Sequence, residues 1–412
     1  MPRARLAPAM ALRVFLPFAL GYYFSYLVRN VNAVIAPDLV GELGLTAASL
    51  GLLTSVYFFA FAAFQLPLGV LLDRYGPRRV ESVLLLFAAA GSALFALSDE
   101  LLGLTVGRAL IGLGVSAGLM AAFKANTLWI PPERTAFVNG CVMTAGGLGA
   151  LSATAPVEAL LGIVGWRGVF WVLALTAALA AVSIHTVVPR RAEEAAHGTG
   201  ETLADALRGV AQVFSSRAFW RVLPASTLAQ ASFMSIQGLW VGPWLMDVAR
   251  LDQVAAAQRL FWIAVAMIAG FFTLGAIASR FARHGLLVPA GAFTAFMLTQ
   301  LALILVPVAW TAPLWLLFGY FGTCGILYYS YLSGQFPTRL SGRVVTGLNV
   351  FTFAGAFLLQ WGMGVVIEHW PGSAPGSYLQ QGYRAAFASA LILQALSFAC
   401  LLLVRERKPA AG

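Results

Sequence analysis

Apolar runs of roughly 20 residues, separated by short polar segments, follow one another through almost the whole chain. The hydrocarbon core of a bilayer is about 30 Å thick, and roughly 20 helical residues are needed to cross it. Within lipid every backbone N–H and C=O must be paired inside the protein, which a helix achieves along its own length. The pattern therefore predicts an all-α membrane protein with many spans, and it excludes a water-soluble domain.

Hydropathy and helix-breaking residues divide the chain into twelve predicted spans. Only 10% of the residues are charged and the mean hydropathy is +0.83, which leaves little sequence for anything outside the membrane. The spans are predicted at residues 12–36, 49–72, 80–98, 101–128, 137–162, 167–188, 218–246, 255–279, 286–307, 312–336, 343–368 and 382–404.

A hydrophilic stretch in the middle of the chain and a repeated motif indicate two related halves. We expect residues 1–188 to form an N-terminal six-helix bundle, 189–217 a solvated cytoplasmic linker, and 218–412 a C-terminal six-helix bundle. Pro132-Glu133-Arg134 recurs as Pro337-Thr338-Arg339, about half the chain later. Such an internal repeat predicts two pseudo-symmetric bundles.

The net charge of +10 is explained by membrane topology rather than by nucleic-acid binding, because the basic residues lie between apolar runs and not on one face. With both termini in the cytoplasm, most arginines fall in inside segments, and only a few fall outside. The outside arginines are Arg167, Arg250, Arg259 and Arg384. This asymmetry predicts a multi-pass protein of a bacterial inner membrane, in contact with lipid and not with nucleic acid.

The three cysteines indicate neither a disulfide framework nor a metal site. Cys141, Cys324 and Cys400 each lie alone within an apolar run, so we expect them to pack between helices. The spans contain no His/Glu metal motif, Ser/His pairing or phosphate loop. We therefore expect no cofactor and no enzymatic activity, and we expect a monomer.

A compact motif follows the second predicted span. Gly69 lacks a side chain and permits close helix packing, and Gly76 permits a tight turn. Asp73 can accept charge-assisted hydrogen bonds, and Arg74 and Arg78 can donate them. We expect these five residues to form a gating latch on the cytoplasmic side, which holds one conformation closed and breaks in each transport cycle.

This motif, G-x-x-x-D-R-x-G-x-R from Gly69 to Arg78, resembles the signature loop between helices 2 and 3 of the major facilitator superfamily. The resemblance covers essentially the whole chain. It implies two six-helix bundles around a central cavity that opens alternately to each side of the membrane. It also implies that helices 1, 4, 7 and 10 line the cavity, and that the protein is a transporter.

Arginines inside predicted spans point to an anionic substrate. A charge at membrane depth costs on the order of 3 kcal/mol or more, so it needs a partner or a function. Arg29 lies eight residues before Pro37, about 12 Å from the end of the first span, and Arg108 lies at a similar depth in the fourth. Two guanidinium groups at one level repel unless an anion lies between them, and their planar fork suits a carboxylate or phosphate.

The segment from Arg29 to Pro37 resembles the R-x7-P pattern of the anion:cation symporter branch and, more loosely, of organophosphate antiporters. In those families the helix-1 arginine contacts the anionic group of the substrate. The sequence departs from the pattern at Val28, which replaces an acidic residue, and at Val115, where a helix-4 carboxylate is expected. The usual residues for proton coupling are therefore missing.

Glu158 is the only membrane-embedded carboxylate that this interpretation leaves for coupling. It is expected either to pair with Arg108 or Arg29, or to bind a coupling proton. Lys124 lies near the cytoplasmic end of helix 4, where its long side chain can extend to the membrane surface.

Polar and aromatic residues at helical spacing mark the opposite wall of the expected cavity. They lie on helices 7 and 10, and include Gln230, Met234 and Tyr331. Together with the two arginines, the candidate substrate contacts are Tyr26, Gln237, Trp240 and Tyr328. A cationic wall that faces an aromatic and amide wall suits a small organic anion.

The sequence therefore predicts a secondary active transporter that moves a small organic anion, a carboxylate in particular, by import. The alternative is a proton-coupled exporter of drugs or other lipophilic compounds. Helix 5 has Gly146, Gly147 and Pro156 but no glycine-proline dipeptide of the kind drug antiporters carry. Metal uptake is disfavoured, because Met234 and Met267 have no Met or His four residues away.

Overall fold

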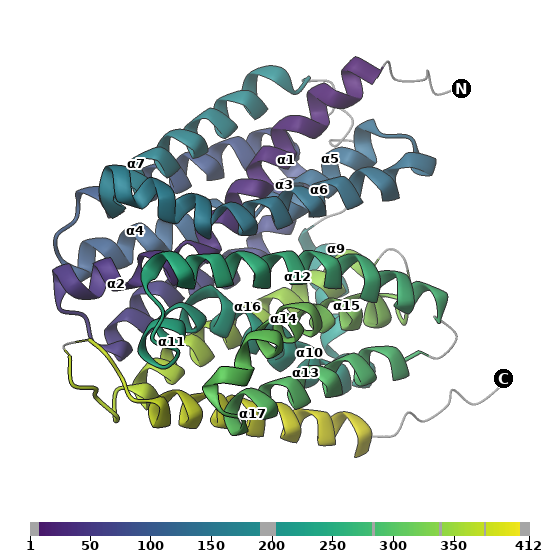
Figure 1. Ribbon diagram of the computed structural model, residues 1–412. Coiled ribbons are helices and arrows are strands. Elements are labelled where there is room, and N and C mark those ends of the chain that lie inside the picture. The colour runs from purple at the N-terminus through teal and green to yellow at the C-terminus, as the bar shows by residue number, and fades with distance from the viewer. Residues whose placement is uncertain (1–7, 190–202, 282–284, 338–339, 375, 404–412) are drawn as a thin grey trace, which may run out of the picture.

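The computed structural model describes residues 8–189, 203–281, 285–337, 340–374 and 376–403 (Figure 1). The side chains of residues 8–11, 73, 132, 133, 136 and 203–207 are outside this description. Within it, the chain is almost wholly helical.

The helices are α1 (Pro8–Asn30), α2 (Asn32–Leu43), α3 (Ala47–Leu97), α4 (Leu101–Gly114), α5 (Gly118–Trp129), α6 (Pro132–Ser152), α7 (Ala155–Val187), α9 (Leu203–Phe214), α10 (Arg217–Ser235), α11 (Val241–Asp247), α12 (Gln253–Arg280), α13 (Leu287–Leu305), α14 (Thr311–Phe321), α15 (Gly325–Ser333), α16 (Ser341–Ile367) and α17 (Gln380–Leu403). A π-helical turn, Ile236–Trp240, joins α10 to α11.

Twelve membrane-crossing segments can be traced through these helices, as the sequence predicts. Nine candidate spans among the described residues are long and apolar enough by themselves. The other three are interrupted or shorter: α1 with α2, α6, and α10 with α11. Gly76 (φ 77°) divides α3 into two spans, and Gly165 (φ 67°) divides α7, since only glycine adopts such angles without strain.

The two halves of the chain form separate helical layers that meet at one end (Figure 1). Helices α1–α7 lie in one half and α10–α17 in the other. We call the end that carries both termini the terminal side and the opposite end the far side. The halves converge at α2 and α11 on the far side and diverge toward the terminal side (Figure 1).

Most hydrogen bonds between the halves of the described structure lie toward the far side, and the one between Asn349 and Gln65 lies nearer the terminal side. They begin at the start of α3 and follow its packing against α16. They are Ala47 N to Tyr378 Oη (2.8 Å), Ala48 N to Glu368 Oε2 (3.1 Å), Gln253 Nε2 to Asp38 Oδ2 (2.9 Å) and to the Val34 carbonyl (3.3 Å), Gln360 Nε2 to Thr54 Oγ1 (2.8 Å) and Asn349 Nδ2 to Gln65 Oε1 (3.4 Å). The far side is therefore the closed one.

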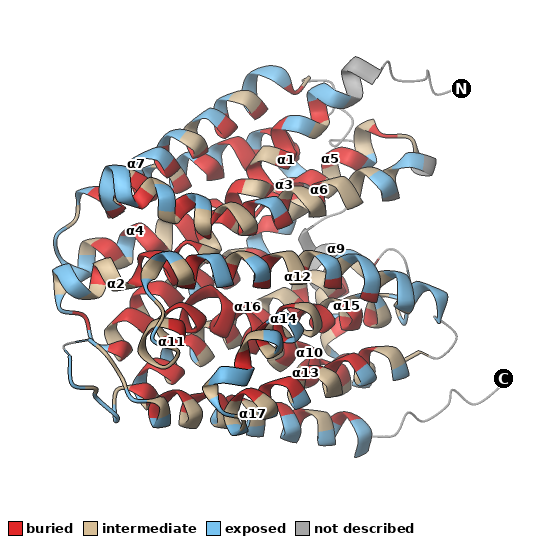
Figure 2. Cartoon of the chain, in the orientation of Figure 1, coloured by how far each residue is buried: buried red, intermediate tan, exposed pale blue. Residues whose placement is uncertain are grey.

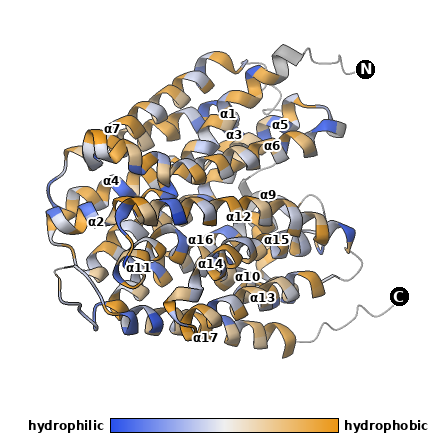
Figure 3. Cartoon of the chain, viewed as in Figure 1, coloured by the Kyte–Doolittle hydropathy of each residue, from blue (hydrophilic) through white to orange (hydrophobic). Residues whose placement is uncertain are grey.

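The outer surface of both halves is apolar, as a lipid environment requires. Buried residues gather between helices, while the faces turned outward are exposed (Figure 2). The same outward faces are largely hydrophobic (Figure 3). Leu175, Leu179 and Val182 of α7, for example, are all more than half exposed. An apolar surface of this extent would aggregate in water and is stable in a bilayer.

The predicted linker is more structured than a solvated connector. Residues 190–202 of it are outside the described part of the chain, but α9 forms from Leu203 to Phe214. Val213 is fully buried, and the ring of Phe214 lies 5.1 Å from that of Phe219 in α10. This end of the linker therefore packs onto the C-terminal half.

Glycines allow the helices of the N-terminal half to touch backbone to backbone. A Cβ atom added at Gly112 of α4 would lie 2.2 Å from the carbonyl oxygen of Tyr57 in α3. We therefore expect Gly112→Val to destabilise the bundle by about 1–3 kcal/mol or more, because the helices must separate to admit the side chain. Thermal unfolding of the purified protein measures this loss. Gly140→Val is the control, since no atom lies within 4 Å of its added Cβ, and an equal loss in both variants would contradict the packing argument.

Candidate functional site

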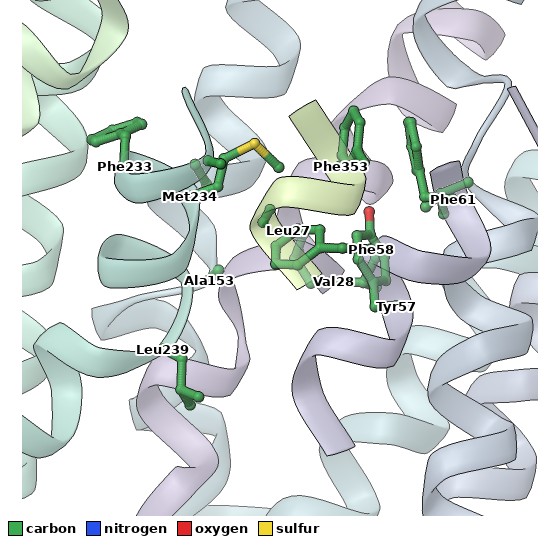
Figure 4. Packing of buried hydrophobic residues seen from close by; sticks show 14 of the residues in the cluster. Leu27, Val28, Tyr57, Phe58, Phe61, Ala153, Phe233, Met234, Leu239 and Phe353 are labelled. Atoms are coloured by element: carbon green, nitrogen blue, oxygen red, sulfur yellow. The ribbon is translucent and has the colours of Figure 1, made fainter. Parts of the chain in front are cut away.

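Arg29 lies near the end of α1, beside the break between α1 and α2. Its guanidinium carbon is 4.7 Å from the centre of the Tyr26 ring, 5.1 Å from Phe353 and 5.6 Å from Phe61. Phe353 belongs to α16, in the other half, and stacks on Phe61 with 3.8 Å between ring centres (Figure 4). Arg29 is therefore held at the boundary of the two halves by aromatic faces.

The positive charge of Arg29 is not neutralised by a carboxylate within the described residues. Its buried Nε has no hydrogen-bond acceptor. Each cation–π contact contributes about 0.5–2 kcal/mol, whereas a hydrogen bond to a charged group contributes about 1.5–3 kcal/mol. The guanidinium group can therefore accept an anionic partner that the protein itself does not supply.

A small pocket adjoins Arg29 between the halves. It is lined from α1 by Tyr26, Arg29 and Asn30, from α10 and the π-helical turn by Gln230, Phe233, Met234 and Gln237, and from α12 by Met267 and Phe271. Its free volume is about 20 Å³, room for about one water molecule. An organic anion must therefore displace side chains to enter, and methionine and phenylalanine at this wall can yield because they make no directional bonds.

Two glutamines of this pocket have side-chain oxygens that accept no hydrogen bond from the described protein. The Oε1 atoms of Gln230 and Gln237 are buried and accept no hydrogen bond. The amide nitrogen of Gln237 donates only a long contact, 3.8 Å, to the sulfur of Met267. Buried amides normally have partners, so these groups can serve a ligand that carries hydroxyl or carboxyl groups.

The pocket brings together three of the six predicted substrate contacts: Arg29, Tyr26 and Gln237. It also contains Gln230 and Met234, which the helical spacing placed on the same stripe. Sequence reasoning did not identify Phe61, Phe353, Met267 or Phe271 as neighbours of the site. Apolar and aromatic residues occur on every face of membrane helices, so nothing in the sequence distinguishes these four.

Arg108 lies elsewhere, between α1, α3 and α4. It is 1% exposed, its Nη1 donates to the carbonyl of Val28 (3.2 Å), and its guanidinium carbon is 5.3 Å from the centre of the Tyr57 ring. Arg108 therefore does not line the pocket beside Arg29, although Tyr57 lies near both arginines. The close packing of α4 on α3 at Gly112 draws Arg108 into the interior of its own bundle.

Trp240 and Tyr328 also lie apart from the pocket. Trp240 donates its indole N–H to the carbonyl of Gln360 (3.0 Å) and packs in the closed contact between the halves. Tyr328 is fully buried within the C-terminal half, where its ring lies 6.2 Å from that of Phe293. Both positions follow from helix rotation, which spacing alone does not define.

Glu158 is not the only carboxylate at membrane depth, and that interpretation was wrong. Glu158 lies in the first turn of α7 and is partly exposed. Among the described side chains it forms no ion pair with Arg29 or Arg108. Glu81 of α3, by contrast, is completely buried. Glu81 lies at the start of the predicted span 80–98, and its position in the sequence does not indicate that it is buried.

The motif from Gly69 to Arg78 lies on the terminal side. Arg78 is buried, and its Nε donates to the carbonyl of His185 (2.9 Å) at the end of α7. Arg74 is exposed and lies over the ring of Tyr75, while the side chain of Asp73 is outside the described part of the chain. Gly69 does not make the predicted close approach here: no atom lies within 4 Å of its added Cβ. The halves diverge on this side (Figure 1), which agrees with the open space beside Gly69 among the described residues.

Comparisons with known proteins agree with this architecture. A sequence model of the Major Facilitator Superfamily matches residues 18–360. A probable sulfoacetate transporter of Cupriavidus necator, SauU, is 32% identical over 152 residues, 37% of this chain and 35% of that protein. The hexuronate transporter of Escherichia coli is 26% identical over 151 residues, 37% of this chain and 35% of that protein. The chain thus aligns with about a third of the length of these curated relatives.

A solved structure resembles the chain over nearly its whole length. It is a bacterial homolog of the human lysosomal transporter Spinster, in an inward-facing and unoccupied conformation. The TM-score is 0.76, the sequence identity is 18%, and the match covers 97% of each chain. At this identity the likeness establishes the shared fold.

Proposed function

Because this chain belongs to the major facilitator superfamily and is a multi-pass membrane transporter, not an enzyme, we propose that it carries a small organic anion by alternating access. A carboxylate is the preferred class, and import is the preferred direction. The substrate binds between the two halves, with its negative group at Arg29. We place the protein in a bacterial inner membrane with both termini in the cytoplasm, so that the terminal side faces inward.

The observation that carries this proposal is a guanidinium group at the boundary of the halves without a carboxylate partner among the described residues. Arg29 contacts aromatic rings from both halves, Phe61 and Phe353. An anion bound at Arg29 therefore changes the contacts of both halves. The named substrates of two relatives, sulfoacetate and hexuronate, are small organic anions, which supports the same class.

Arg108 has a different role in this proposal. It is buried against the backbone of α1 at Val28, one residue before Arg29. We assign it the positioning of α1 rather than direct substrate contact. Arginine suits this role because it keeps its charge and donates several hydrogen bonds in fixed directions.

Transport by purified protein in proteoliposomes tests the proposal. Vesicles are loaded with buffer and mixed with labelled organic anions, inorganic phosphate or a lipophilic cation, with and without an inward proton gradient. We expect uptake of at least one carboxylate or sulfonate. Movement of the lipophilic cation alone, with no anion carried, would overturn the proposal in favour of the drug exporter.

Gln237→Leu is expected to weaken binding of a hydroxylated carboxylate about fivefold, since one net hydrogen bond contributes about 1 kcal/mol. Leucine keeps the approximate size of the side chain, so the pocket should retain its shape. Titration calorimetry of the wild type and variant measures the change. Equal affinity in both would place the ligand away from this wall.

A further inference from the structure

Glu81 is a buried carboxylate that the transport site does not use. It lies in the second span of α3, five residues after the break at Gly76, about 7 Å along the helix from its terminal-side end. Its side chain is 0% exposed. Neither Oε1 nor Oε2 has a hydrogen-bond partner. A carboxylate in this condition is rare in a protein interior.

The walls around Glu81 are close. A Cβ added at Gly21 of α1 would lie 3.0 Å from Glu81 Oε1, 3.5 Å from Leu85 and 3.7 Å from Ile184 of α7. A Cβ added at Gly118 of α5 would lie 3.7 Å from the same oxygen. Two glycines thus make room for the carboxyl group, and although Tyr22 and Ser25 of α1 lie beside Gly118, no group donates a hydrogen bond to either oxygen of Glu81.

The ionisable groups of the surrounding helices do not neutralise Glu81, because neither carboxylate oxygen has a hydrogen-bond partner. On α1 the hydroxyl of Tyr22 contacts the sulfur of Met143 (3.7 Å). On α3 itself, Arg78 donates to the carbonyl of His185 in α7, whose ring is exposed. The other charged residues of these four helices are Arg13 and Arg29 of α1, Asp73, Arg74 and Arg79 of α3, Lys124 of α5, and Glu158 and Arg167 of α7.

An ionised carboxylate is very unfavourable in such surroundings, so the neutral, protonated form is the one compatible with this arrangement. We propose that Glu81 binds the proton that is coupled to transport, and that its protonation stabilises the arrangement closed on the far side. This inference rests on the proposed function, since it assumes alternation between two arrangements. By linkage, the closed far side is favoured at low pH and loses stability as pH rises.

One helix connects Glu81 to the anion site. Gly21, which packs against Glu81, and Arg29, which lines the pocket, both lie on α1, about 12 Å apart along its axis. Between them the rings of Tyr22 and Tyr26 are 5.2 Å apart, and Arg29 lies over Tyr26.

The sign of the coupling follows from the charges. An ionised Glu81 would oppose a second negative charge at Arg29, whereas a protonated Glu81 would not. Proton and anion therefore favour each other's binding, which is the condition for symport.

Distance measurements between spin labels test the proposal without any substrate. Thr127 at the end of α5 and Ser330 in α15 are exposed on the terminal side of opposite halves. They are changed to cysteine after Cys141, Cys324 and Cys400 have been replaced by alanine. In lipid nanodiscs, the label distances are recorded from about pH 5 to about pH 9, a range that brackets the titration of a buried carboxyl group.

We expect the wild type to show long distances at low pH and shorter ones at high pH, with the population ratio changing by up to about tenfold per pH unit, the limit for one proton. Glu81→Gln, which mimics the protonated form, should keep the long distance throughout. Glu158→Gln is the matched control and should follow the wild type. Titration of Glu81→Gln like the wild type would overturn the proposal, as would a wild type without pH response.

An infrared titration of the wild type tests the proposal even if the Glu81→Gln variant fails to fold. The carbonyl stretch of a protonated carboxyl group should be present at low pH and disappear as the far side opens. Its absence at every pH in that range would refute protonation at Glu81. Anion binding at Arg29 is measured separately, so failure here with binding intact rejects the proton site alone.

Discussion

Arg29→Ala is expected to weaken binding of the transported anion by about 10- to 150-fold while the protein stays folded. A hydrogen bond to a charged group contributes about 1.5–3 kcal/mol, and 1.4 kcal/mol corresponds to a tenfold change in affinity. Stability should change little, because the guanidinium group forms no ion pair among the described residues and its Nε has no acceptor. Ligand-induced thermal stabilisation and titration calorimetry measure the two effects in the same preparation.

Two further variants define what Arg29 supplies. Arg29→Lys keeps the positive charge but loses the planar fork, so it should bind with intermediate affinity. Arg280→Ala removes an exposed arginine at the end of α12 and should bind like the wild type. Full affinity in Arg29→Ala would contradict the proposed site. Equal loss in Arg280→Ala would mean that net charge, rather than a defined contact, attracts the anion.

Gly364→Val is expected to open the far side. Gly364 of α16 lies in the contact between the halves, where an added Cβ would be 2.4 Å from the carbonyl oxygen of Ala47 and 3.0 Å from the ring of Trp240. Valine cannot fit there unless α3 and α16 separate. Overpacking costs about 1–3 kcal/mol, so the closed arrangement should lose population by about 5- to 150-fold relative to the open one.

Chemical accessibility at Leu50 measures that shift. Leu50 is 3% exposed and lies in α3 near the same contact, so Leu50→Cys should react slowly with a membrane-impermeant maleimide. Addition of Gly364→Val should accelerate the reaction. Gly362→Val is the matched control on the same helix, since no atom lies within 4 Å of its added Cβ. The same rate in both valine variants would show that the contact does not hold the far side closed.

Much of the fold could be predicted because bilayer thickness sets the length of each apolar segment in the sequence. The span predicted at 49–72 is Ala47–Leu72 in the structure, and the one predicted at 382–404 is Gln380–Leu403. The turn at Gly76 was also predictable, because a glycine in a charged loop between two apolar runs indicates a sharp change of chain direction.

The candidate site was only partly predictable, because it depends on how helices rotate and pack. Arg29 was identified from the cost of a charge in lipid and from the R-x7-P pattern that it begins. Arg108 met the same criterion, yet the backbone of Val28 and the ring of Tyr57 surround it, and no pattern in the sequence encodes those contacts. Glu81 was overlooked because its burial depends on Gly21 and Gly118 of two other helices.

A structure of the protein with a transported carboxylate bound is the most direct test of the central claim. We expect the carboxylate group within hydrogen-bond distance of Arg29, with Phe61 or Phe353 displaced from the guanidinium face and the body of the ligand against Gln230 and Gln237. A carboxylate bound elsewhere, with both rings still covering Arg29, would contradict it.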